Sequence, residues 1–309
     1  MIGCGPFIFE KYDKDAETVY LKANSNYFAG KPSVDRIERR YFKSLDSLLL
    51  ALKKGEIDAQ LDYYIAAPGV LAAGLIKEDD VKLSIVPNIA VPLHLVFGYR
   101  QYPMNVTEFR NAVSYAVDCK SLVEMIAAGY GEVPGKGYTP SALSFCNPDL
   151  PKMEYDPKKA NDMLNSSGFL DIDGDGFREA PNGSKLRIPI TPNVRHTETI
   201  RAAEVIVHQL AQVGLDTYAD VLSKDAASKR INVDRDYFIT IGYSTPYGNL
   251  MASGFAGGYF LDMPGMYGTC KDQEIVDLVQ KSMYAKDMTE SNKWKKEIQA
   301  YVAREQPII

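Results

Sequence analysis

The stretch that decides the fold is residues 186–221, which read LRIPITPNVRHTETIRAAEVIVHQLAQVGLDTYADV. Leu186, Ile188 and Ile190 alternate with their neighbours, and this period of two is typical of a half-buried strand. The next apolar residues recur at helical spacing until Gly214, and they are Ile200, Ala203, Val207 and Leu210. Alternation then resumes from Leu215 to Val221. A strand, a crossover helix and a second strand predict a right-handed parallel unit.

Further strands are expected on both sides of this unit. Alternating apolar residues predict strands at 19–23, 37–41 and 236–243. A helix is predicted for 45–52, where leucines follow helical spacing, and a strand that contains Ile57 is predicted to follow it. These elements indicate an α/β or mixed α+β fold with mixed sheets.

Terminal signals place the other helices. Asn105 and Glu108 form the spacing of a capping box at the start of one helix. Asp156 and Pro157 predict the start of a helix over 157–167, because aspartate is a preferred cap and proline is tolerated in the first turn; Gly168 then suits its end. Two last helices are expected around 275–279 and 294–302.

Composition narrows the classes of function. The 309 residues suffice for two lobes or one large domain, and a net charge of -5 without a long basic run argues against nucleic acid as a partner. The N-terminus lacks the pattern of a signal peptide, and no stretch reaches the length of a membrane span. The cysteines at 4, 119, 146 and 270 form no CxxC pair, which argues against a zinc site; the sequence allows a disulfide such as Cys119 to Cys146 without assigning it.

Several strings resemble the family-5 extracellular solute-binding proteins, which serve peptide and nickel ABC importers. GCGPF at 3–7, KANSNYFAGKP at 22–32 and KGEID at 54–58 are similar to that family's GTGPF, ANPDYWGGKP and SGEID segments. FRNAVSYAVD at 109–118 and YDPKKANDML at 155–164 resemble VRQALNYAID and the start of YDPEKAKALLAEAGF. The departures, Cys4 for threonine, Phe28 for tryptophan and Cys119 for a common arginine, touch no expected ligand position.

The resemblance implies a periplasmic-binding-protein-like fold of type II, with two lobes and mixed sheets. The GTGPF-like string normally follows a long preceding region, so the chain is expected to be a truncated fragment. Residues 1–90 would be part of lobe I, which is incomplete, and 91–309 most of the opposite lobe, without its C-terminal return strand.

The implied function is capture of a ligand by closure between lobes, without catalysis. The expected ligands are oligopeptides or dipeptides, and nickel or another metal chelate is the alternative. The protein would be periplasmic or extracellular, and it would associate with the membrane through permease subunits or a lipid anchor. No serine-hydrolase, phosphate-loop or HExxH motif favours an enzyme.

Aromatic residues at strand ends are the candidate ligand contacts. Tyr243, Ser244 and Tyr247 lie in a turn that resembles the family's WGAPYDP or WCADYN segment, where an aromatic residue faces the cleft. Tyr63 and Tyr64 could line the opposite wall, and ordinary packing is the alternative for all five. The turn lacks the aspartate that pairs with a peptide's amino group, which weakens the case for simple peptides.

Two metal hypotheses remain open. Imidazole suits nickel, and the histidines are His94, His196 and His208, although burial or capping explains each of them more simply. Asp171, Asp173, Asp175 and Glu179 occupy positions 1, 3, 5 and 9 of a calcium loop, but position 12 is Asn182 rather than glutamate. A plain Asp/Gly turn is the alternative. If calcium does bind, a calcium-stabilised extracellular sensor without a transport role becomes the rival function. No other cofactor is expected.

Overall fold

A computed structural model describes residues 3–60, 74–75, 77, 81–82, 93–133, 135–141, 143–194, 196–243, 261–262 and 268–309. The chain divides into two compact units. The first, unit 1, is Met1–Asp62 with Leu75–Lys82, and the second, unit 2, is Tyr63–Gly74 with Leu83–Ile309. The boundary predicted near residue 90 lies outside the described residues. No helix in the described part of the chain has the length and apolar character needed to cross a membrane.

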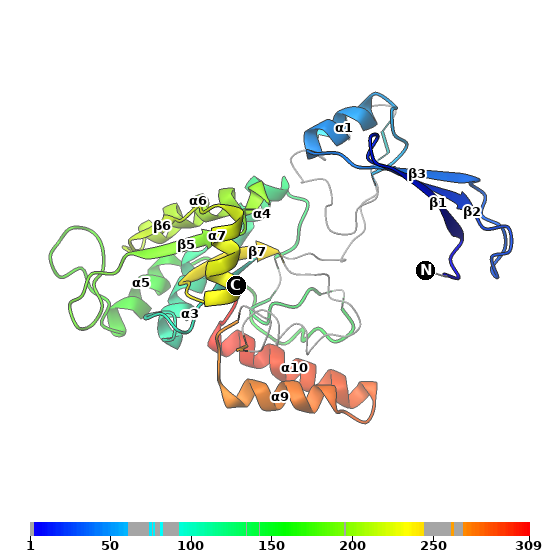
Figure 1. Cartoon of the computed structure of the whole chain (residues 1–309). Helices are drawn as coiled ribbons and strands as arrows, with labels where there is room; N and C mark the ends of the chain where they lie inside the picture. Colours follow the sequence, from blue (N-terminus) through cyan, green and yellow to red (C-terminus); the bar gives the residue numbers. More distant parts are fainter. Residues whose placement is uncertain are drawn as a thin grey trace. The chain divides into compact units, whose positions relative to one another are not determined.

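The described residues of unit 1 include a three-stranded antiparallel sheet and a helix (Figure 1). The strands are β1 (Phe7–Asp13), β2 (Thr18–Ala23) and β3 (Arg36–Arg40), in that order, and the helix is α1 (Leu45–Lys53). β2, β3 and α1 confirm the pattern predictions. β1 was not predicted, because the register shifts between Phe9 and Lys11 and this irregularity breaks the alternation of its side chains.

The strand predicted around Ile57 is wrong. Ser44 caps the start of α1 by accepting a hydrogen bond from the Ser47 amide at 3.2 Å. At the other end, the amides of Lys54, Gly55 and Glu56 donate to carbonyls of the last turns of α1. These N–H groups close the helix and cannot pair in a strand ladder, and Gly55 has the positive φ of +69° that such an ending favours.

Unit 2 is built around a four-stranded mixed sheet in the order β4-β7-β5-β6. Its strands are β4 (Leu93–Phe97), β5 (Ile188–Pro192), β6 (Thr217–Ala219) and β7 (Ile239–Tyr243). β5 runs parallel to both of its neighbours, and the helix α6 (Thr197–Ala211) connects β5 to β6, so the predicted parallel unit is confirmed. β4 pairs antiparallel with β7.

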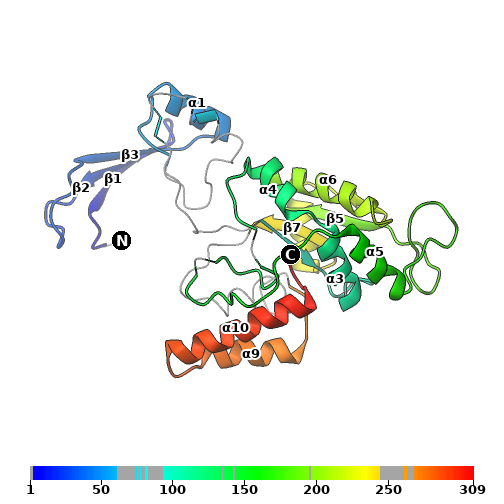
Figure 2. The ribbon, with the colours of Figure 1, turned by 180° about the vertical axis from the view of Figure 1, so that it is seen from behind.

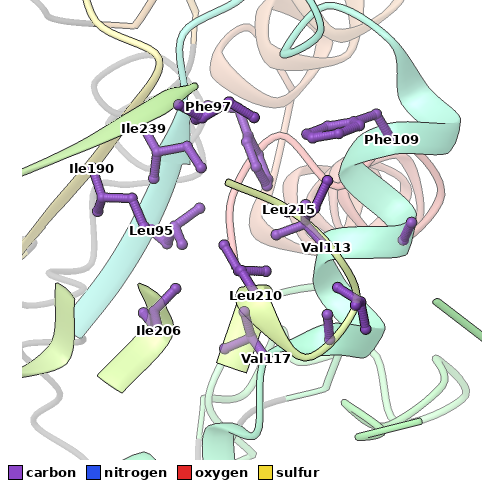
Figure 3. Close-up of a cluster of buried hydrophobic side chains, with 14 of the residues drawn as sticks. Leu95, Phe97, Phe109, Val113, Val117, Ile190, Ile206, Leu210, Leu215 and Ile239 are labelled. Atoms are coloured by element: carbon purple, nitrogen blue, oxygen red, sulfur yellow. The ribbon is translucent and has the colours of Figure 1, made fainter. Parts of the chain in front are cut away.

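Helices cover this sheet and bury its apolar side chains. They are α3 (Thr107–Ala116), α4 (Cys119–Ala127), α5 (Pro157–Ser166) and α6. Figure 3 shows Phe97 and Leu95 of β4 together with Phe109 of α3 and Leu210 of α6 in one cluster. Each such side chain contributes about 1.5–3 kcal/mol when it is fully buried, so this core fixes the sheet on which the site is built.

Helix α5 confirms its sequence signals, whereas the capping box of α3 is wrong. The Asp156 carboxylate accepts a hydrogen bond from the Lys159 amide at 2.9 Å, and Gly168 has a φ of +82°. Helix α3 has Val106 at its cap position and no side-chain cap. Its start is held instead by Arg110, which is 1% exposed and donates from Nε to the Glu305 carbonyl at 2.9 Å.

Further helices of unit 2 follow β6. α7 (Lys224–Ser228) continues into a π-helical turn, η1 (Lys229–Asp234). α9 (Gln273–Met283) and α10 (Met288–Glu305) lie side by side as an antiparallel hairpin (Figure 2). After α10 the chain pairs with β4, where Leu95 and Ile309 exchange two backbone hydrogen bonds of 2.9 Å. This short pairing extends the sheet beyond β4.

The four cysteines are free thiols, so the disulfide that the sequence left open does not form. Burial raises the pKa of Cys119 to about 12. A thiol with such a pKa stays protonated at neutral pH and behaves as a small apolar side chain, which accounts for its place against the main core.

Candidate ligand-binding site

A pocket of about 220 Å³ lies at the carboxyl ends of β5 and β7. These strands are parallel neighbours, so both end at the same edge of the sheet. β4 runs the other way and brings His94 opposite Gly242 at that edge. Residues of α7 and η1 line the pocket as well. Ligands of open α/β sheets bind outside the carboxyl ends of the strands, so this edge is the candidate site.

Tyr243 is the last residue of β7 and part of the pocket wall. Its ring meets the ring of His196 edge to face, with centroids 5.0 Å apart. Burial, followed by the negative charge of Glu198, raises the pKa of Tyr243 to about 12. The phenol therefore stays neutral at physiological pH and offers both an aromatic face and a hydroxyl. Its contact with ligand remains a prediction.

His94 lies deeper in the same pocket and is 2% exposed. Its Nδ1 is 3.1 Å from the Tyr138 hydroxyl, and the two rings are nearly perpendicular. A Cβ placed on Gly242 would lie 3.7 Å from His94 Nε2, so this nitrogen sits beside the backbone at the end of β7. The bonded, buried histidine that the sequence favoured is what the structure shows, and it also lines the pocket.

Polar groups from three elements complete the lining. Asn193 follows β5, Lys224 begins α7 and Asn232 lies in η1. No aspartate or glutamate is among the described lining residues. The described wall thus offers amides, one ammonium, one imidazole and a phenol, a set suited to hydrogen-bond acceptors and to anionic groups.

Sequence reasoning missed Asn193, Lys224 and Asn232. Asn193 had a usable signal, because it directly follows a strand of the predicted parallel unit. The other two had none, since they come from a short helix and a π-helical turn far along the chain. Four predicted contacts, Tyr63, Tyr64, Ser244 and Tyr247, lie outside the described residues.

A more open depression of about 380 Å³ lies between α4 and α6, and its lining includes Met125, Tyr155 and His208. It is away from the strand ends, and Tyr243, the predicted ligand contact that the structure describes, is not part of its lining. His208, which the sequence placed on a helix, lines this depression.

The predicted calcium loop brings three of its four carboxylates together. Oxygen atoms of Asp171, Asp173 and Glu179 lie within 4.8 Å of one another. Lys185 sits between Asp173 and the fourth carboxylate, Asp175, with Nζ 2.8 Å from Asp173 and 2.7 Å from Asp175. The hydrogen bond from Lys185 lowers the pKa of Asp175. An ammonium group thus already pairs with two of the four carboxylates of the predicted loop.

Comparison with known proteins gives the family. Residues 1–261 match the bacterial extracellular solute-binding proteins, family 5 Middle, and the chain belongs to this family. The family consists of binding proteins.

Individual relatives differ in what they bind. The chain is 28% identical over 236 residues to the oligopeptide-binding protein AppA of Bacillus subtilis. The matched region covers 75% of this chain and 41% of that protein. It is 26% identical over 218 residues to the nickel-binding periplasmic protein of Escherichia coli, covering 70% of this chain and 40% of that protein. The chain thus spans about two fifths of the length of these relatives.

A solved structure supports the fold. NikA from Brucella suis, in complex with Fe(III)-EDTA, superposes with a TM-score of 0.86 over 99% of this chain and 61% of that chain, at 17% identity. At this identity the likeness concerns the fold alone. It confirms the expected binding-protein architecture.

Proposed function

We propose that the chain is part of the solute-capturing component of an ABC importer, with oligopeptides or dipeptides as its ligands. The observation that carries this proposal is the pocket at the carboxyl ends of β5 and β7 in a chain of the family-5 fold. Permease subunits are the partners it would deliver to, outside the cytoplasmic membrane, with a lipid anchor as a further means of attachment. The relative AppA supports a peptide as ligand.

A metal chelate is the second candidate. Two imidazoles favour it, because His94 lines the pocket and His196 lies against Tyr243 of its wall. The absence of a carboxylate from the described lining also removes the natural partner for a peptide's amino group. The nickel-binding relative is consistent with this alternative.

Native mass spectrometry of the protein as purified separates the candidates. A bound peptide mixture gives a ladder of adduct masses, whereas a nickel chelate gives one mass with the nickel isotope pattern. We expect the ladder, and we expect acid release to yield peptides. A single nickel adduct would replace the peptide proposal. If no adduct is found, titration calorimetry with dipeptides, tripeptides and nickel-histidine gives the answer, and absence of heat with all of them would contradict ligand capture by this chain.

A further inference from the structure

The turn between α9 and α10 carries three exposed apolar side chains that belong to neither hydrophobic core of the described residues. Tyr284 is 83% exposed, Met288 63% and Met283 55%. The apolar faces of the two helices are already buried in a second core that also includes Val96 of β4, through residues such as Ile275 and Ile298. Exposed apolar side chains gathered at one place mark an interaction surface more often than chance scatter does.

Serine residues explain why these side chains point outward. Near the turn the two helices meet through Ser282 and Ser291, whose hydroxyl oxygens are 3.5 Å apart, and the Ser291 hydroxyl donates to the Ser282 carbonyl at 3.1 Å. Such small polar contacts leave no space between the helices for long apolar side chains. At this end of the hairpin the serines therefore fill the space between the helices, and the methionines and the tyrosine lie on the outer surface. Both views place this turn at the end of the hairpin away from the sheet of unit 2 (Figures 1 and 2).

Lysines surround the apolar group. Residues 281–296 contain five lysines and two acidic residues, Asp287 and Glu290, in a chain whose net charge is -5. Both acidic side chains accept hydrogen bonds from backbone amides at the start of α10, where Asp287 receives the Glu290 amide and Glu290 receives the Lys286 amide. Within the described residues the exposed lysines 281, 286, 293 and 296 form no ion pair. Lys295 is buried against Phe145.

Trp294 lies on α10 beside two of these lysines, and it follows the apolar side chains of the turn in sequence. Its ring centroid is 5.0 Å from Lys281 Nζ and 4.9 Å from Lys293 Nζ. An aromatic ring flanked by lysines and close in sequence to exposed apolar side chains is typical of segments that lie at a membrane surface. In such segments aromatic rings lie at the level of the headgroups, and lysines contact lipid phosphates. A fixed protein surface would select lysines held in ion pairs of defined geometry, whereas these lysines form no ion pair among the described residues, and Lys281 and Lys293 lie only against the Trp294 ring. A lipid surface requires no fixed geometry.

We propose that this hairpin tip, formed by Met283, Tyr284, Met288, Trp294 and lysines 281, 286 and 293, docks on an anionic phospholipid surface. The lysines approach the headgroup phosphates, and the methionines and the tyrosine enter the boundary between headgroups and acyl chains. None of the tip residues is part of the described lining of the ligand pocket, so the proposed lipid contact requires no choice between a peptide and a chelate.

Trp294 is the single tryptophan of the sequence, so its fluorescence reports directly on the tip. With vesicles of phosphatidylglycerol and phosphatidylcholine at low salt, we expect a blue shift, quenching by brominated lipid, and cosedimentation of the chain. Pure phosphatidylcholine vesicles should give none of these. Lys281→Gln with Lys286→Gln should weaken partitioning about thirtyfold, since each lysine near an anionic surface contributes about 1 kcal/mol.

Matched variants distinguish lipid binding by the tip from nonspecific lipid binding by exposed apolar side chains. Tyr284→Ser with Met288→Ser should abolish the blue shift, whereas Met125→Ser with Tyr130→Ser, which removes an exposed methionine and tyrosine near the end of α4, should leave it unchanged. The proposal is overturned if the chain does not bind anionic vesicles at low salt, or if both double variants bind equally. Loss of uptake in the tip variants without vesicle binding would assign the tip to a protein partner instead, which also overturns it.

Discussion

Tyr243 shows what one residue contributes at the candidate site. Its ring lines the pocket and packs edge to face on His196, so removing the ring should expose the bound ligand to water. Tyr243→Ala is expected to weaken binding roughly tenfold, and Tyr243→Phe, which keeps the ring, to weaken it less. Calorimetric titration with the ligand identified by mass spectrometry measures both. Tyr218→Ala, on β6 and outside the pocket lining, is the control. Equal binding by all three variants would contradict a role for the ring.

The ionisation of Tyr243 gives a sign for pH dependence. Its pKa is raised from 10.0 to about 12, so the folded state favours the protonated phenol. The stability from this group is complete below pH 10 and is lost as pH rises from 10 towards 12. Binding should therefore show no dependence on this phenol near neutral pH.

At this scale the sequence predicted residues whose place follows from a local pattern. Tyr243 ends a strand with a clear alternation, and the structure places it at the edge of the sheet where the pocket opens. Lys224 and Asn232 reach the pocket because α7 and η1 fold back to β7, and no local pattern encodes that return. Cys119 looked available for a disulfide, but its burial depends on packing from several helices.

The loop between α5 and β5 permits a test at the scale of an element. Lys185 already forms ion pairs with Asp173 and Asp175, and backbone amides donate to both oxygens of Asp171. We therefore expect millimolar calcium to leave the melting temperature of the unaltered chain unchanged. Lys185→Met removes the ammonium and leaves the carboxylates to repel one another, so calcium should raise the melting temperature of that variant.

The comparison is made by differential scanning fluorimetry with calcium, with magnesium and with chelator. A calcium-dependent rise in the unaltered chain would show that the ion displaces Lys185. That result would revive the calcium-stabilised sensor as the function of this chain.

Elements with strong local signals were predicted well, and those held by distant partners were not. The β5-α6-β6 unit and α5 follow from periodicity, caps and a glycine with positive φ, all within one stretch of chain. The start of α3 depends on Arg110 and on Glu305, which is 195 residues away. The segment after α1 was expected to begin a strand, but its amides close the helix. Local sequence preference does not decide the structure where backbone N–H and C=O groups are already hydrogen-bonded to other partners.

For the whole molecule, burial is unevenly distributed between the two units. The main core of unit 2 contains Phe97, Phe109, Leu210 and many further apolar side chains below 10% exposure. In unit 1 the buried apolar side chains among the described residues are Leu49, Ala51 and Leu75, and most of β1 is exposed. A unit that buries so little apolar surface has a small margin of stability. Two units with separate cores also need not unfold together.

We therefore expect unit 1 to unfold at lower denaturant than unit 2. Trp294 lies in unit 2 and is the single tryptophan, so its fluorescence follows that unit, whereas far-ultraviolet circular dichroism follows both. The dichroism transition should begin first, and the two curves should not coincide. Leu49→Ala, in α1, should reduce only the free energy of unfolding of unit 1 and so shift only the early transition. Ile298→Ala, in α10, should reduce only that of unit 2, each by about 2–5 kcal/mol, and so shift only the late transition. Coincident curves that both variants shift equally would show that the units unfold as one cooperative body.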